Sequence, residues 1–167
     1  MVKSIFVLFF IFFTVVCNIT AQEKSVQDSL EKRIKFDPSR NPETDLKNAI
    51  KEAEKSGKRI LLDVGGEWCI WCHRIDEFLF KNKDLNEFLH NNFVVVKVNY
   101  STENKNEKFL SQYPKVAGYP HIFILEKDGE FLHSQDTGKL EKGKGYNHNK
   151  FLQFLKNWAP KHLNKMK

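Results

Sequence analysis

The sequence predicts an α/β domain in which helices flank a central mixed β-sheet. Two apolar segments of strand length, residues 59–64 and 93–99, stand on either side of a helical pattern. This spacing predicts a parallel strand pair with a right-handed crossover. Segments 121–125 and 131–133 flank Lys127-Asp128-Gly129, and an Asp-Gly turn between apolar segments predicts an antiparallel β-hairpin. A sheet with both kinds of pairing is mixed, and a helical pattern after the hairpin completes the fold with a C-terminal β-hairpin and helix.

The first predicted helix spans residues 42–56 and precedes the first strand. Asn41 can cap it, Pro42 suits the first helical position, and Gly57 follows its last turn. Four apolar side chains recur on one face of this helix: Leu46, Ala49, Ile50 and Ala53.

The remaining helices are predicted from periodicity and from their ends. One opens at the cysteine segment after the first strand, and Asp84 is expected to cap a further turn or two. Residues 104–113 are predicted as a helix, and a last helix runs from near Asn149 to Pro160. Residues 138–149, which contain three glycines and several lysines, are predicted as a solvated surface loop.

Length and composition indicate one globular domain with an extension. The chain has 167 residues, of which 41% are hydrophobic and 29% charged, and a formal net charge of +6. The lysines are scattered, and many stand beside Glu or Asp. This pattern favours a solvated basic surface over nucleic-acid binding, because no basic run with interleaved aromatic residues occurs.

The beginning of the chain has the pattern of a signal peptide. Lys3 supplies a positive charge, residues 5–17 are apolar apart from Thr14, and Ala21 is the small residue that signal peptidase needs. We therefore predict a signal peptide over residues 1–21, and a periplasmic or secreted protein. The apolar run is too short to span a bilayer, so no stable membrane anchor is expected.

The sequence divides the mature chain into three parts. Residues 22–40 are predicted as a flexible leader without an assigned function, in which Ile34-Lys35-Phe36 forms one short edge strand before Pro38. The domain itself covers residues 41–163, and residues 164–167 form a tail.

The most informative segment is residues 65–73, Gly-Gly-Glu-Trp-Cys-Ile-Trp-Cys-His. Two thiols separated by two residues can exchange a disulfide or hold a metal, and with His73 directly after them they can carry a covalently attached haem. Cys69 sits at the predicted start of a helix, where free N–H groups and the helix dipole stabilise a thiolate. Cys72 lies one turn inside, so we predict that Cys69 is the nucleophile and Cys72 the resolving thiol.

Residues 41–160 resemble a thioredoxin-fold protein at three places. Residues 62–72 match the thioredoxin strand-to-helix segment, Lys97-Val98-Asn99 falls where thioredoxins have a central-strand lysine, and Tyr119-Pro120 falls where they have a cis-proline before the hairpin. The helix before the first strand and residues 78–82 are most similar to exported thioredoxin-like proteins related to the C-terminal domain of the transmembrane thiol-disulfide interchange protein.

The resemblance implies roles for residues around the cysteines. Asp63 is expensive to bury as a charged group, so we expect a raised pKa that lets it accept the Cys72 proton, and the resemblance assigns it this role with Lys97 nearby. Trp68 is expected to form a rim that receives substrate. Pro120, if cis, would place the backbone of Tyr119 ready to pair with an extended substrate.

The function predicted from these residues is an exported thiol-disulfide oxidoreductase. Its implied partners are protein or peptide thiols and disulfides and a redox-recycling partner protein, and it needs no cofactor and no metal. Ile70-Trp71 between the cysteines matches neither thioredoxin nor the oxidases and isomerases, so the direction of electron flow does not follow from the resemblance.

Three alternatives remain open at the level of sequence. Cys69, Cys72 and His73 satisfy the haem-attachment pattern, although the only methionines, Met1 and Met166, leave no convincing sixth ligand. A metal-binding or copper-delivery module would use the two cysteines with His73 or His121, which is an incomplete set for structural zinc. A peptide-binding module with an idle redox couple is the third alternative.

Overall fold

The structure is a computed structural model that describes residues 33–161. Its contacts divide the chain into two units, Met1–Ile34 and Lys35–Lys167, and the second contains the fold described below. The predicted signal peptide and most of the predicted leader therefore lie outside the described residues, as does nearly all of the tail. The elements follow in this order: α2 (Pro42–Ser56), β1 (Arg59–Gly65), α3 (Ile70–Lys81), α4 (Lys83–Asn92), β2 (Phe93–Asn99), α5 (Glu107–Leu110), β3 (His121–Leu125), β4 (Phe131–Asp136), the 3-10 helix η1 (Thr137–Leu140), β5 (Glu141–Lys142), β6 (Gly145–Tyr146) and α6 (His148–Trp158).

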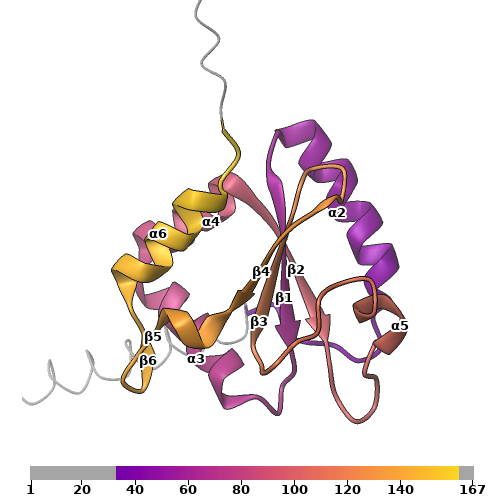
Figure 1. Cartoon of the computed structure of the whole chain (residues 1–167), viewed down its shortest axis with the longest axis horizontal. Coiled ribbons are helices and arrows are strands. Elements are labelled where there is room, and N and C mark those ends of the chain that lie inside the picture. Colours follow the sequence, from indigo (N-terminus) through magenta and orange to yellow (C-terminus); the bar gives the residue numbers. More distant parts are fainter. Residues whose placement is uncertain (1–32, 162–167) are drawn as a thin grey trace, which may run out of the picture. The chain divides into compact units, whose positions relative to one another are not determined.

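The central sheet has four strands in the order β2-β1-β3-β4 (Figure 1). β1 pairs in parallel with β2, which places Asp63 beside Lys97, and it pairs antiparallel with β3. β3 and β4 form the antiparallel hairpin, with Asp128-Gly129 in its turn. The predicted mixed α/β sheet is therefore confirmed.

Alternation along β1 separates two hydrophobic cores. Ile60, Leu62 and Val64 face the core that also contains residues of α2 and α5, whereas Leu61 faces the core built with α3, α4 and α6. Figure 1 shows these two groups of helices on opposite faces of the sheet. Because side chains alternate along a strand, Asp63 and Gly65 share the face of Leu61 and point towards α3.

Local signals at the ends of α2 act as predicted. The Asn41 side chain accepts a hydrogen bond from the backbone N–H of Thr44 at 2.8 Å, and Pro42 is the first helical residue. Gly57 ends the helix with φ +72°, a left-handed conformation that a residue without Cβ adopts at little cost.

The predicted helix over residues 104–113 is wrong in its extent, because α5 covers only Glu107–Leu110. Asn104 accepts a hydrogen bond from the N–H of Asn106, and the Asn106 side chain donates to the carbonyl oxygen of Asn99. Side-chain amides that bond the local backbone compete with helix formation, and Asn106 adopts a positive φ of +48° just before the helix.

The predicted surface loop over residues 138–149 is also wrong. Most of this segment is η1 followed by a small hairpin of β5 and β6, which turns at Gly143 with φ +62°. Leu140 and Tyr146 are buried and anchor the hairpin to the core beside α3. The last helix starts at His148, one residue before Asn149, and Asn147 caps it.

Two smaller predictions near the ends of elements need correction. Ile34-Lys35-Phe36 forms no strand, and the N–H of Phe36 donates instead to the Glu67 carboxylate at 2.9 Å. Asp84 does not cap α4, which begins at Lys83, and its carboxylate pairs with His148 at 2.8 Å.

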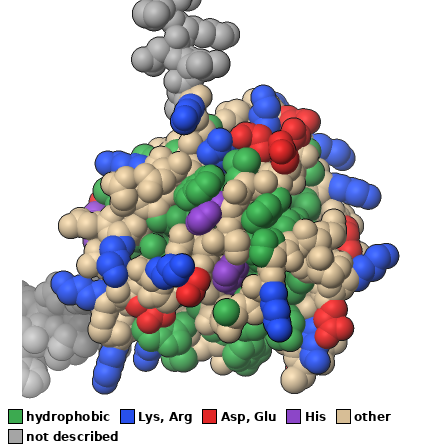
Figure 2. Space-filling model, in the orientation of Figure 1, with side chains coloured by type: hydrophobic (Ala, Val, Ile, Leu, Met, Phe, Trp, Pro, Cys, Tyr) green, Lys and Arg blue, Asp and Glu red, His purple; other side chains and the backbone are tan. Residues whose placement is uncertain are grey.

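The surface in Figure 2 carries hydrophobic side chains in the middle of the face shown, with Lys and Arg mainly around the rim. Within residues 33–161, no helix has the length and apolar character that are needed to cross a bilayer.

Candidate functional site

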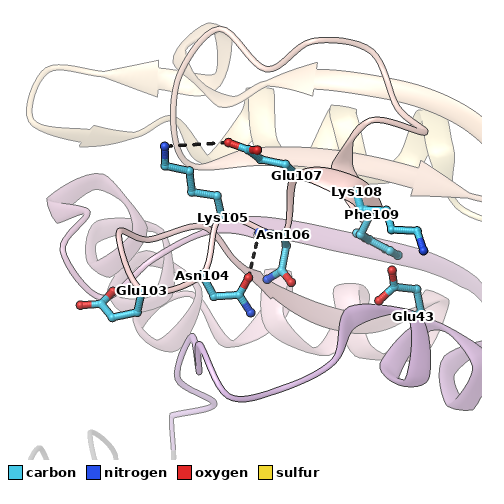
Figure 3. A pocket seen from close by; sticks show the side chains of 8 residues that line it. All are labelled: Glu43, Glu103, Asn104, Lys105, Asn106, Glu107, Lys108 and Phe109. Carbon is cyan, nitrogen blue, oxygen red and sulfur yellow. Dashed lines mark hydrogen bonds and ion pairs between the residues drawn. The ribbon is translucent and has the colours of Figure 1, made fainter.

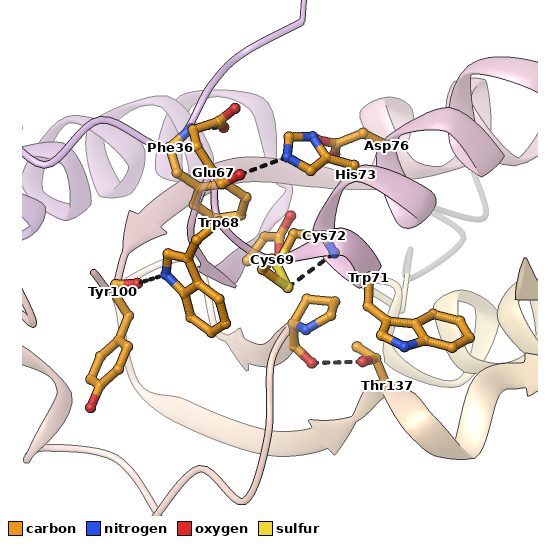
Figure 4. Close-up of a disulfide and its surroundings, with 12 residues drawn as sticks. Phe36, Glu67, Trp68, Cys69, Trp71, Cys72, His73, Asp76, Tyr100 and Thr137 are labelled. Carbon is orange, nitrogen blue, oxygen red and sulfur yellow. Dashed lines mark hydrogen bonds between the residues drawn. A yellow bond between two sulfur atoms is a disulfide. The ribbon is translucent and has the colours of Figure 1, made fainter. Parts of the chain in front are cut away.

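Cys69 and Cys72 lie at the start of α3 and are joined in a disulfide with their Cα atoms 5.2 Å apart (Figure 4). Cys69 is the N-cap of the helix. Its sulfur accepts a hydrogen bond from the backbone N–H of Cys72 at 3.1 Å. A helix N-terminus that donates to a sulfur stabilises negative charge on that sulfur.

Two glycines allow close packing at the end of β1, Gly65 against the first turn of α3 and Gly66 against the residue that follows β2. A Cβ on Gly65 would lie 2.4 Å from the sulfur of Cys72, and a Cβ on Gly66 would lie 2.7 Å from the carbonyl oxygen of Tyr100. Neither position has room for a side chain. The absence of Cβ atoms therefore lets the strand approach the disulfide closely.

The two cysteines are buried, but their neighbours are not. Trp68 and Ile70 are each 60% exposed and flank Cys69 in the sequence, whereas Cys72 is fully buried. Figure 4 shows Trp68 and Trp71 on opposite sides of the disulfide. A partner that reaches the disulfide therefore meets an apolar surface first.

A buried cluster of charges lies on the face of the sheet that carries Gly65. The Lys97 ammonium contacts the carboxylates of Asp63 at 2.7 Å and Asp76 at 2.5 Å. The three side chains are only 9%, 8% and 11% exposed. Burial disfavours the charged form of Lys97, but its attraction to the two carboxylates outweighs burial and raises the pKa of Lys97 above its ordinary value.

Asp76 was not identified from the sequence. It lies on α3 four residues after Cys72, and positions four apart share one face of a helix. The spacing of four residues between Cys72 and Asp76 was the sequence signal that could have identified this carboxylate.

An aromatic cluster adjoins Cys69. Trp68 donates from its indole N–H to the carbonyl oxygen of Tyr100 at 2.7 Å and meets the ring of Tyr119 edge-on, with centroids 5.8 Å apart. The rings of Tyr100 and Tyr119 are stacked at 4.6 Å. Burial and the neighbouring Tyr100 raise the pKa of Tyr119 well above its ordinary value. The structure thus brings Trp68 and Tyr119 together beside the cysteines, since Tyr119 packs against the cluster of Phe36, Cys69 and Cys72.

The Tyr119–Pro120 peptide bond is cis. The carbonyl oxygen of Pro120 accepts a hydrogen bond from the buried hydroxyl of Thr137 at 2.6 Å. This bond fixes the segment before β3 to the 3-10 helix that follows β4.

Trp71, the second residue between the cysteines, is held from two sides. The Arg74 guanidinium lies 4.4 Å from its ring centroid, and Tyr146 of β6 meets the ring edge-on at 5.8 Å. The hairpin that sequence patterns assigned to a solvated loop therefore contacts the residue next to Cys72.

His73 does not join a cluster of metal-binding side chains. Its Nε2 donates to the backbone carbonyl oxygen of Glu67 at 2.8 Å. Residues 33–161 contain no group of three or more His, Cys, Asp or Glu side chains arranged to hold a metal ion.

Two depressions lie near the loop that follows β2. One, of about 410 Å³, is lined by Phe36, Pro38, Trp68 and Tyr100 among other residues and adjoins the site. The other, of about 540 Å³, is lined mainly by polar residues between Glu103 and Lys108 (Figure 3) and contains none of the predicted site residues.

Comparison with known proteins identifies a family. Residues 46–144 match the model of the thioredoxin-like domain. The thiol:disulfide interchange protein DsbD of Actinobacillus pleuropneumoniae is 28% identical over 100 residues, which are 59% of this chain and 16% of that protein. The disulfide bond reductase DsbH of Chlamydia pneumoniae is 25% identical over 93 residues, 50% of this chain and 55% of that protein. The chain thus spans a small part of DsbD and about half of DsbH.

Solved structures agree on the fold. The disulphide isomerase of Xylella fastidiosa has a TM-score of 0.64 and 21% identity, and the match covers 75% of this chain and 96% of that one. The oxidised C-terminal domain of DsbD from Neisseria meningitidis has a TM-score of 0.53 and 18% identity, with 76% of this chain and all of that domain covered. The fold, the family model and the Cys-x-x-Cys pair agree: the chain belongs to the thioredoxin-like domain family.

Proposed function

We propose that the protein is an enzyme that exchanges disulfides with protein substrates through Cys69 and Cys72. The observation that carries this proposal is the placement of the pair. Cys69 caps α3 and its sulfur accepts the N–H of Cys72, while Cys72 is buried behind it at disulfide distance. The DsbD and DsbH relatives, named for thiol:disulfide interchange and disulfide bond reduction, support the same chemistry.

The proposed cycle starts from the dithiol form. The Cys69 thiolate attacks one sulfur of a substrate disulfide, that bond breaks, and the second substrate sulfur leaves as a thiolate. Cys72 then loses its proton and attacks the Cys69 sulfur, which releases the substrate as a dithiol and leaves the protein with its own disulfide. The substrate gains two electrons and the protein loses two. A recycling partner protein returns the electrons, and the same steps in reverse would oxidise a substrate.

Asp63 is proposed to accept the proton of Cys72. It lies two residues before Gly65 on the same face of β1, about 7 Å along the strand, and a Cβ on Gly65 would touch the Cys72 sulfur. One ammonium is shared by two carboxylates in the buried cluster. Burial and a neighbouring carboxylate both disfavour the charged form of Asp63, which supports proton uptake by that side chain. Lys97 is proposed to hold the two carboxylates in place.

Trp68, Tyr119 and Pro120 are proposed to receive the substrate. Trp68 is exposed next to the nucleophile. The backbone of Tyr119 lies in the bend just before β3, at the cis peptide bond, and an extended substrate chain could pair with it there. Backbone pairing would bind many sequences, and the aromatic surface would favour apolar side chains next to the substrate cysteine.

The protein is also proposed to act after export, as a periplasmic or secreted enzyme. The charged and apolar pattern of residues 1–21 supports this. Mass spectrometry of the mature protein tests it: a first residue at Gln22 is expected, and a retained segment 1–21 would contradict export by cleavage.

The function is tested by reduction of insulin disulfides, with glutathione or dithiothreitol as the electron source. The wild-type protein should accelerate insulin precipitation, and Cys69→Ser should abolish the acceleration. The proposal is contradicted if the wild-type protein neither accelerates insulin precipitation nor reactivates scrambled ribonuclease. Both negative results would favour a binding module with an idle redox couple.

A further inference from the structure

Phe36 lies ten residues before the part of the chain that matches the thioredoxin-like domain, yet it belongs to the site. Its side chain is only 2% exposed and forms one buried cluster with Cys69 and Cys72. The residues on either side of it in the sequence are polar or charged, apart from the exposed Ile34 and Pro38. The burial of a single aromatic side chain from such a segment is explained by specific contacts.

The ring of Phe36 covers two parts of the site at once. The Lys97 ammonium lies 4.5 Å from the ring centroid. A Cβ on Gly65 would lie 3.1 Å from the tip of the ring and 2.4 Å from the Cys72 sulfur. Phe36 therefore packs over the strand end that separates the disulfide from the cluster of Asp63, Lys97 and Asp76.

Polar contacts hold the segment of Phe36 against the domain. The N–H of Phe36 donates to the Glu67 carboxylate at 2.9 Å, and Asn104 donates to the carbonyl oxygen of Pro38 at 2.9 Å (Figure 4 shows Phe36 and Glu67). Glu67 lies in the cysteine segment and Asn104 in the loop after β2. Two different parts of the domain thus fix the position of the ring.

We propose that Phe36 is a positioning residue that keeps water away from the buried carboxylates, so that Asp63 can take the proton of Cys72. The inference deepens the proposed thiol-disulfide exchange and rests on it. Without the ring, water would solvate the Asp63 carboxylate and stabilise its charge, which weakens its tendency to take up a proton. The ammonium would also lose its contact with the ring face. Only the step in which Cys72 attacks should suffer, because Cys69 is activated by the helix N-terminus.

The two steps can be separated with an aromatic disulfide, 5,5′-dithiobis(2-nitrobenzoate), added to the reduced protein. Attack by Cys69 breaks the reagent disulfide and releases one coloured thiolate. Attack by Cys72 on the mixed disulfide releases the second and leaves the Cys69–Cys72 disulfide. The protein loses two electrons and the reagent gains two. Stopped-flow absorbance therefore records the first attack and the resolution as two phases.

Phe36→Ala should slow the second phase by about tenfold, on the scale of a lost cation–π contact in a dry site, and leave the first phase within about twofold. Phe36→Leu, which keeps the apolar volume, should restore most of the second-phase rate. In an Asp63→Asn background, Phe36→Ala should have no further effect, because the group on which it acts is gone. Ile34→Ala, at a 62% exposed position two residues earlier, is the matched control and should change neither phase.

Other results would overturn the proposal. An unchanged second phase, an equal slowing of both phases, or the same effect of Phe36→Ala with and without Asp63 would each remove the positioning role. If Phe36→Ala does not fold, as judged by circular dichroism, the smaller change Phe36→Val replaces it, with a smaller but equally selective slowing expected.

The outcome is distinguishable from failure of the proposed function. Wild-type protein that reacts in two phases with the small reagent but does not reduce insulin would reject the protein substrates and keep the role of Phe36. The opposite result is that the wild-type protein reduces insulin and that Phe36→Ala leaves the second phase unchanged. This result would keep the proposed function and reject the role of Phe36.

Discussion

Gly65→Ala tests the close approach between β1 and the disulfide. The new Cβ would lie 2.4 Å from the Cys72 sulfur and 3.1 Å from the ring of Phe36. Favourable contacts between such atoms need about 3.5–4.0 Å. The strand or the first turn of α3 must therefore move by about 1 Å. Overpacking of this kind in a well-packed core costs about 1–3 kcal/mol.

Urea denaturation of the oxidised protein measures this cost. A loss of about 2 kcal/mol should lower the urea midpoint by about 1 M. Gly118→Ala is the matched control, because a Cβ there meets nothing within 4 Å and no positive φ is required, and it should leave stability unchanged or slightly higher. In a Cys72→Ala background, which removes the sulfur, Gly65→Ala should cost less than about half as much. Equal costs for the two glycine variants, or the same cost with and without the Cys72 sulfur, would refute the packing described here.

The other predictions concern the charged cluster and two histidines whose pKa is lowered, His121 and His90. Asp63→Asn should slow the attack of Cys72 on a mixed disulfide by about 100-fold, as expected for loss of a general base, and leave the first attack unchanged; an unaltered resolution rate in stopped-flow measurements would remove Asp63 from the mechanism. The pKa of Lys97 is raised above 10.5 in the folded state, so its contribution to stability is complete below pH 10.5 and is lost as the pH rises through the folded value. Lys97→Met should cost about 3–5 kcal/mol at neutral pH and remove this alkaline loss in urea titrations, and an alkaline loss that persists in the variant would contradict the assignment. Burial lowers the pKa of His121 and of His90 below 6.5, so the unfolded state takes up protons first and stability should fall as the pH drops below 6.5. Replacing both histidines with Gln should flatten the dependence of unfolding free energy on pH between 7 and 5, and an unchanged slope would show that other groups cause it.

The order of the main elements was predictable because their signals are local. Asn41, Pro42 and Gly57 mark the ends of α2, and the apolar strands have the lengths and turn residues expected of them. Such signals act over a few residues and depend little on the rest of the fold. The βαβ unit and the Asp-Gly hairpin then leave few ways to arrange the sheet.

One wrong prediction occurred where contacts distant in the sequence decide the structure, and another where side-chain hydrogen bonds compete with a helix. The hairpin of β5 and β6 has strands of two residues and is stable because Leu140 and Tyr146 are buried against α3. No sequence pattern within residues 138–149 indicates that contact. The short extent of α5 follows from the side-chain hydrogen bonds of Asn104 and Asn106, whose partners lie in the neighbouring backbone.

The Cys-x-x-Cys pair of the candidate site could be predicted from the sequence, and the surroundings of the pair only partly. Cys69, Cys72, Asp63 and Lys97 occupy positions that a family resemblance supplies, and the structure places Asp63 and Lys97 in one ion pair. Phe36 stands in a segment without a helical or strand pattern. Its burial against the cysteines depends on contacts with residues distant in the sequence, which no local pattern indicates.

The central claim, that Cys69 attacks a substrate disulfide and Cys72 resolves the product, is tested most directly by trapping the intermediate. Reduced Cys72→Ser protein, mixed with a protein disulfide such as insulin, should accumulate a covalent complex. Mass spectrometry should assign the complex to a disulfide between Cys69 and a substrate cysteine, and a reductant should cleave it. Cys69→Ser should form far less complex, because Cys72 is buried behind the helix N-terminus. Equal trapping by the two variants, or trapping through Cys72 alone, would contradict the account.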